Sequence, residues 1–115
     1  MRLIFFILFW TFNLAGQEYE FRSDWVEVCP TGLPPEAKED QVDFVITPTL
    51  LTIDYTPIKL WFQRATRDSR GYARLEFRTV LGAEYIIYFY NQEVTSILFR
   101  NDRGWVHFKK RIRRA

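Results

Sequence analysis

The feature that most constrains the fold is an alternation of apolar and polar residues with a period of two. It is clearest at 74–79, where Leu75 and Phe77 alternate with charged residues. Successive side chains of a β-strand point to opposite faces, so this pattern is typical of a half-buried antiparallel strand. Similar runs, bounded by proline, glycine or asparagine, occur at 25–29, 42–47, 50–54, 58–63, 85–90, 95–100 and 105–109. The chain is therefore predicted to be all-β, with about seven to eight short strands.

Short turns separate most of these strands, which favours a meander. An antiparallel meander closes through neighbouring hairpins, and we expect a small barrel or a rolled two-layer sheet. The exception is a long first loop at 30–41, where Pro34-Pro35-Glu36-Ala37-Lys38-Glu39 looks helical for barely one turn.

Residues 1–16 carry the features of a secretory signal peptide. An arginine precedes the apolar run 3–10, and the small residues Ala15 and Gly16 follow. The run is shorter than the roughly 20 residues that span a bilayer, which favours a cleaved leader over a membrane anchor. We expect a secreted or periplasmic protein that meets the membrane only during export, with a single β domain at 17–115.

The single cysteine, Cys29, leaves hydrophobic packing as the main source of stability, because no internal disulfide can form. In an exported protein a lone cysteine is a buried small side chain, a free thiol or half of an intermolecular disulfide. Cys29 ends the run 25–29 and precedes Pro30, which indicates the end of a strand.

A basic tail occupies 109–115 and holds five of the sixteen basic residues of the chain. A solvated terminus and contact with an anionic surface or polymer both explain such a tail. Export argues against a nucleic-acid partner. The candidate contact residues are Lys109, Lys110, Arg111, Arg113 and Arg114.

Hairpin loops set the expected strand register. A two-residue turn at Gly82-Ala83 would place Phe77 opposite Tyr88, and would pair Ile87 and Phe89 with charged residues. The strand 85–90 is then apolar on both faces. Either a second layer covers its outer residues, or they form an exposed apolar patch of the kind that marks a binding surface.

A four-residue loop at 101–104 would place Arg100 opposite Trp105 and Leu98 opposite His107. A guanidinium group stacked on an indole adds about 0.5–1 kcal/mol, which is ordinary surface stabilisation, and a role in a binding site is the alternative. His107 is the only histidine and lies beside Lys109 on its face.

The residues that carry enzyme chemistry are scarce. One histidine and one cysteine cannot form a zinc site from the usual ligands. The chain lacks a nucleophile elbow, a Walker loop and a dinucleotide fingerprint. We therefore expect a non-catalytic protein with no catalytic residues, no metal and no cofactor.

The order of parts is similar to that of the lipocalin-like, or calycin, barrels. The parts are a leader, a tryptophan that opens the first strand in Ser23-Asp24-Trp25, the long first loop and a meander. The resemblance implies a cavity for a small hydrophobic molecule, with the long loop near its mouth and with Phe77, Tyr88 and Phe108 among the inward aromatics. Ser23 stands where the family's Gly-x-Trp motif has glycine, and a barrel this small can be filled by its own side chains.

Three functions follow as hypotheses. The first is binding of a small apolar ligand, and the second is a protein-interaction or inhibitor-like domain with Cys29 in an intermolecular disulfide. The third is adhesion to an anionic polymer through the basic tail. The candidate residues for a ligand or interaction surface are Trp61, Tyr85, Ile87, Phe89, Arg100 and Trp105.

Overall fold

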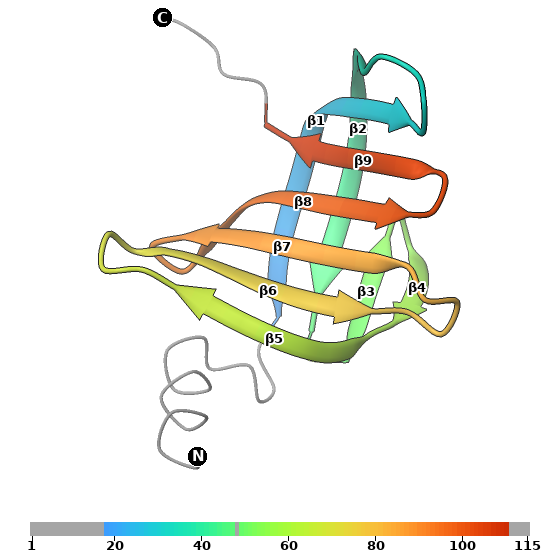
Figure 1. The fold of residues 1–115 in the computed structure, drawn as a ribbon. Helices are drawn as coiled ribbons and strands as arrows, with labels where there is room; N and C mark the ends of the chain where they lie inside the picture. The colour runs from blue at the N-terminus through green and yellow to red at the C-terminus, as the bar shows by residue number, and fades with distance from the viewer. Residues whose placement is uncertain (1–17, 48, 111–115) are drawn as a thin grey trace, which may run out of the picture.

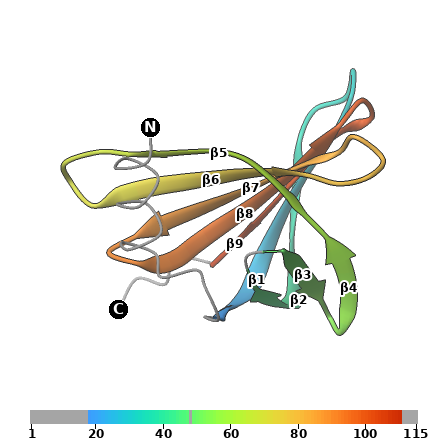
Figure 2. The same ribbon diagram turned by 90° about the horizontal axis from the view of Figure 1, so that it is seen from below.

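The computed structural model describes residues 18–47 and 49–110 and shows an all-β, nearly closed barrel (Figures 1 and 2). Its strands are β1 (Tyr19–Pro30), β2 (Glu36–Ile46), β3 (Leu50–Ile53), β4 (Thr56–Lys59), β5 (Trp61–Arg67), β6 (Tyr72–Arg78), β7 (Glu84–Tyr90), β8 (Glu93–Asn101) and β9 (Gly104–Lys109). They form one nine-stranded sheet in the order β4-β3-β2-β1-β9-β8-β7-β6-β5. All paired strands are antiparallel, which confirms the predicted meander.

The barrel closes where the first strand pairs with the last. The second half of β1, from Trp25 to Pro30, lies beside β9. Gly104 begins β9 with a φ of 130°, and a Cβ there would overlap the carbonyl oxygen of Cys29. Only glycine allows the two backbones to approach this closely.

The barrel stays open between β4 and β5. The run 58–63 was predicted as one strand, but the chain bends at Leu60, so that β4 and β5 diverge (Figure 2). The Leu60 side chain is buried, and its N–H donates to the carbonyl of Thr49 at 2.9 Å. Pro57 lies within β4, which tolerates it because β4 is an edge strand.

Aromatic and aliphatic side chains fill the barrel. Phe44, Phe77 and Phe89 are among the largest fully buried side chains. The ring of Phe108 packs edge-on against Phe44, with 5.0 Å between the ring centroids. The inward positions predicted for Phe77 and Phe108 are therefore correct.

The predicted register of the β6–β7 hairpin is wrong. The chain turns through five residues, 79–83, with the N–H of Thr79 donating to the carbonyl of Ala83 at 2.9 Å. Phe77 consequently lies opposite Tyr85 instead of Tyr88. The shift is an odd number of residues, so it exchanges the two faces of β7. Ile87 and Phe89 face the core, while Tyr88 lies on the outside.

The predicted long loop at 30–41 is also shorter than expected. Residues 36–41 form the first half of β2, and Glu36, Ala37, Lys38 and Glu39 pair with β1. All six side chains are exposed, so this half of β2 has no apolar alternation to reveal it. The helical turn predicted at 34–39 is replaced by a short loop and the start of this strand.

Two sequence predictions lie outside the described residues. They are the signal peptide at 1–16 and the tail residues Arg111, Arg113 and Arg114. Within the described residues, the structure has no helix long and apolar enough to cross a membrane.

Candidate functional site

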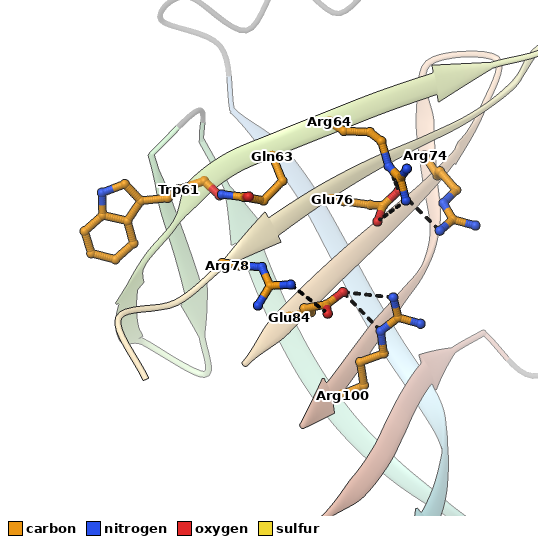
Figure 3. Close-up of polar contacts among 8 residues, drawn as sticks. All are labelled: Trp61, Gln63, Arg64, Arg74, Glu76, Arg78, Glu84 and Arg100. Atoms are coloured by element: carbon orange, nitrogen blue, oxygen red, sulfur yellow. Dashed lines mark hydrogen bonds and ion pairs between the residues drawn. The ribbon is translucent and has the colours of Figure 1, made fainter. Parts of the chain in front are cut away.

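The outer face of β5–β9 carries two clusters in which one glutamate lies between two arginines (Figure 3). We call these six residues the arginine network; its members are Arg64, Arg74, Glu76, Arg78, Glu84 and Arg100. They share one side of the barrel wall because they alternate with inward residues along the strands and pair across them.

Glu76 is the centre of the first cluster. Nε of Arg64 lies 2.8 Å from Oε2 of Glu76, and its Nη2 lies 3.2 Å from Oε1, which is a bidentate contact. Arg74 adds one contact, from Nη2 to Oε2 at 3.2 Å, while its buried Nε has no hydrogen-bond partner. The hydrogen bond from Arg64, with the charge of Arg74, holds the pKa of Glu76 below its ordinary value although the side chain is buried.

Glu84 is the centre of the second cluster. Nε and Nη2 of Arg100 lie 3.1 and 2.8 Å from Oε2 of Glu84. Nη2 of Arg78 reaches Oε1 at 3.4 Å, which is a long contact. Each glutamate is thus held closely by one arginine, and the second arginine of each cluster makes a single weaker contact.

These second arginines, Arg74 and Arg78, are the half-paired members of the arginine network. Four guanidinium groups face two carboxylates, so the network has two positive charges in excess. Both half-paired arginines belong to β6 and are four residues apart, a span of about 13 Å along a strand. The outer face therefore offers two fixed cations at a defined spacing.

The arginine network also explains a buried residue on the outside of the barrel. Ile86 pairs with Glu76 and Leu98 on the outer face, yet it is only 1% exposed. No second layer of strands covers it within the described residues. Long charged side chains bury their aliphatic stems along apolar surface, and the two clusters flank Ile86 in this way.

A groove of about 470 Å³ adjoins the network at Arg74. Its floor follows a row of directly paired outward residues: Thr66, Arg74, Tyr88 and Ser96. The Tyr88 ring lies 6.0 Å from the Arg74 guanidinium carbon and has its centroid 6.0 Å from that of His107. It therefore separates the arginine from the histidine.

His107 of β9 contacts two residues that line the groove, Tyr88 and Ser96. Its Nε2 lies 3.1 Å from the hydroxyl oxygen of Ser96, a hydrogen bond that links β9 to β8. Burial is the largest influence on the pKa of His107 and, with the charge of Lys109, lowers it below its ordinary value. The imidazole is therefore neutral at pH 7.

The predicted surface residues of β7 do not lie on a surface. Ile87 and Phe89 are 0% and 1% exposed and face the core, because the true register turns them inward. Tyr85 also faces inward, and burial raises the pKa of its hydroxyl to about 12. Tyr85 and Ile87 therefore belong to the packing of the barrel, whereas Phe89, although buried, also contributes to the lining of the groove beside Arg74.

The other predicted site residues do lie near the outer face. Arg100 is opposite Trp105, and Leu98 is opposite His107, as predicted. The guanidinium group of Arg100 binds Glu84. Trp61 is 45% exposed and points away from the arginine network in Figure 3.

Cys29 lies half-buried at the end of β1, with its thiol 3.4 Å from the carbonyl oxygen of Leu33. At the end of β9, Lys109 forms an ion pair with Glu27, and Nζ of Lys110 lies 5.7 Å from the centre of the Phe21 ring. Lys109 is paired with Ser96, so the basic tail begins beside the row of residues under the groove.

Sequence reasoning missed Arg64, Arg74, Glu76, Arg78 and Glu84 as site residues. The signal was present, because three of them form the charged side of the alternation at 74–79. A charged side of this kind is ordinarily a solvated face, and only the pairing across strands shows that the charges are clustered.

No protein-family model matches the chain, and no curated protein or solved structure is significantly similar to it. Within the described residues, no group of three or more histidine, cysteine or acidic side chains could hold a metal ion. The site must therefore be interpreted from its own geometry.

Proposed function

We propose that the protein is an exported, non-catalytic binding module that holds an anionic polymer on the outer face of β5–β9. The observation that carries this proposal is the excess of positive charge in the arginine network, which the two glutamates hold in place. Guanidinium groups bind carboxylate, sulfate and phosphate groups through paired hydrogen bonds, and arginines that are already oriented lose little entropy on binding.

The first residue of the basic tail, Lys109, lies on the same face. Lys109 pairs with Ser96 on the outer face, and the sequence continues with four more basic residues. Clustered positive charge raises the local concentration of a polyanion and speeds its association. Lys109 and the arginine network thus place positive charge on the same outer face.

The structure supports the outer face more than the interior as the binding surface. The barrel interior is filled by large side chains such as Phe44, Phe77 and Phe89. Two pockets open on the outside, one beside Arg74 and one beside the Arg22–Asp43 ion pair. A small apolar ligand inside the barrel would need this packing to open.

Retention on immobilised polygalacturonate and dextran sulfate tests the proposal. The double variant Arg74→Gln/Arg78→Gln removes the half-paired arginines, whereas Arg22→Gln/Arg103→Gln removes equal charge from exposed arginines elsewhere. Each charge-assisted hydrogen bond contributes about 1.5–3 kcal/mol, so the first double variant should bind at least about tenfold more weakly. The second should bind nearly as well as wild type.

Equal losses in the two double variants would mean that only net charge matters, and would overturn a site at the arginine network. Failure of the wild-type protein to bind either polymer at physiological salt would overturn the proposed function. Deletion of residues 111–115 should weaken binding further in either background, because the tail and the network contact different parts of the polymer.

A further inference from the structure

We infer that the groove beside Arg74 seats one acidic sugar unit of the polymer, with Arg74 binding its carboxylate or sulfate group. The inference rests on the proposed function, because it names the unit of the polymer that is recognised. It goes beyond that function by assigning a specific pocket to one part of a face that otherwise attracts anions through charge.

Arg74 is the member of the arginine network best suited to bind an external anion. Glu76 already accepts a bidentate contact from Arg64, so its charge is largely satisfied before Arg74 contributes. Arg74 keeps one contact at 3.2 Å, and 37% of its side chain stays exposed. An oxyanion in the groove would supply the opposite charge that this guanidinium group lacks.

The ring of Tyr88 helps to hold the guanidinium group of Arg74 in place. Its ring lies 6.0 Å from the guanidinium carbon of Arg74, within the range of a cation–π contact. The other neighbour of the ring is His107, so Tyr88 is held between two side chains. The guanidinium group of Arg74 is thus positioned by the ring of Tyr88 and by the carboxylate of Glu76.

The remaining lining is mostly apolar, with Tyr72, Ala73 and Phe89 beside several hydroxyl groups, and it suits an organic ligand better than a bare ion. The volume of about 470 Å³ lies in the range of small-molecule pockets. Thr66, Tyr88 and Ser96 supply hydroxyl groups, each of which can donate and accept hydrogen bonds. The hydrogen bond to His107 uses only part of the capacity of Ser96. Arginine for the charge and hydroxyls for the ring substituents together match an acidic sugar.

Among the described residues, Asp68 is the one carboxylate that lines the groove, and it does not oppose an anion strongly. Asp68 lies at the turn between β5 and β6, and its Oδ1 accepts the backbone N–H groups of Arg70 and Tyr72. Its Oδ2 lies 3.3 Å from Nη2 of Arg70. The charge of Asp68 is therefore largely compensated within its own turn.

Titration with sodium glucuronate, glucose and sodium sulfate, followed by backbone amide shifts in NMR spectra, tests the inference on the folded protein. Glucuronate should shift the amides of Thr66, Arg74 and Tyr88, and glucose should not. The double variant Thr66→Val/Ser96→Ala removes two hydroxyls without changing charge, and should weaken glucuronate binding about tenfold, the loss of about 1.4 kcal/mol. Arg22→Gln is the control, because it removes an exposed arginine from β1, outside the arginine network and the groove. It should leave glucuronate binding unchanged.

The outcomes separate the two proposals. Polymer retention without glucuronate shifts in the groove would overturn this inference and leave the proposed function standing. Glucuronate shifts without polymer retention would support the groove and overturn the proposed function. Sulfate that binds as tightly as glucuronate would overturn recognition of a sugar unit, because the site would then select only an anion.

Discussion

Each face of β7 carries a buried isoleucine, but the two side chains are buried by different means. Inward, Ile87 packs in the core with Phe77, Phe89 and Ile97. Outward, Ile86 lies between Glu76 and Leu98 and is flanked by the arginine network. The two isoleucines are neighbours in sequence and are 0% and 1% exposed.

Burial alone therefore does not show that a residue of this barrel belongs to its core. Inside the barrel, the neighbours of Ile87 are themselves held by apolar packing. Outside, Ile86 is paired with Leu98 and with Glu76, and Glu76 is held by ion pairs. The ion pairs of the outer face leave Arg74 and Arg78 half-paired. The charged cover over β7 is thus also the proposed binding surface. Its stabilising role and its binding role can be separated only by matched substitutions.

The largest expected effect comes from truncating the two isoleucines separately. Ile87→Ala should lower the free energy of unfolding by about 4 kcal/mol, because the rigid core cannot close the cavity. Ile86→Ala should cost about 2 kcal/mol, since the flexible arginine stems can move into the space. Urea unfolding of both variants measures the difference. Equal losses would show that the outer cover is as tightly packed as the core.

The next effect tests the ion pairs that form this cover. Glu76→Gln removes a buried carboxylate that two arginines contact, and should cost about 1–2 kcal/mol. Asp43→Asn breaks the exposed ion pair with Arg22 on the opposite wall and should cost at most about 0.5 kcal/mol. Chemical unfolding at low salt provides the measurement. If both substitutions cost the same, Glu76 does not organise the outer face.

The strands themselves were largely predictable, because period-two alternation is a local signal. The β8–β9 register was also predictable, since the short turn before Gly104 limits the pairing. The β6–β7 register was not, because Val80 and Leu81 look like part of a strand yet are 81% and 92% exposed at the loop. Exposed apolar residues in a turn cannot be distinguished from strand residues by composition.

The candidate site was less predictable than the fold. Arg64 pairs with Glu76 only because β5 has an irregularity between Phe62 and Arg64, which changes its register against β6. A bulge of this kind inserts a residue without a reliable sequence pattern. The groove requires residues from β5 to β8 to align in one row, so it depends on three separate registers. Errors in any one of them hide the site.

The smallest expected effect is a dependence of stability on pH at the outer face. His107 lies among Ser96 and Leu98 of β8, Tyr88 of β7, Glu27 of β1 and Lys109 of its own strand. Burial and Lys109 lower its folded-state pKa below 6.5, while Glu27 acts in the opposite direction. At a pH between the folded-state pKa of His107 and 6.5, this histidine binds more protons in the unfolded chain than in the folded one. The contribution of His107 to the free energy of unfolding is therefore complete above about pH 6.5. It is lost as the pH falls through the folded-state pKa of His107.

Unfolding at pH 7.5 and at pH 5.0, for the wild type and for His107→Gln, isolates this contribution, because the carboxylates titrate alike in both proteins. The wild type should lose more stability on acidification than the variant. The inner face has no titrating group with a lowered pKa among the described residues, so the excess loss belongs to the outer face. An identical loss in the two proteins would mean that His107 titrates in the barrel as it does in the unfolded chain, and that the outer face near the groove is more open to water than its packing indicates.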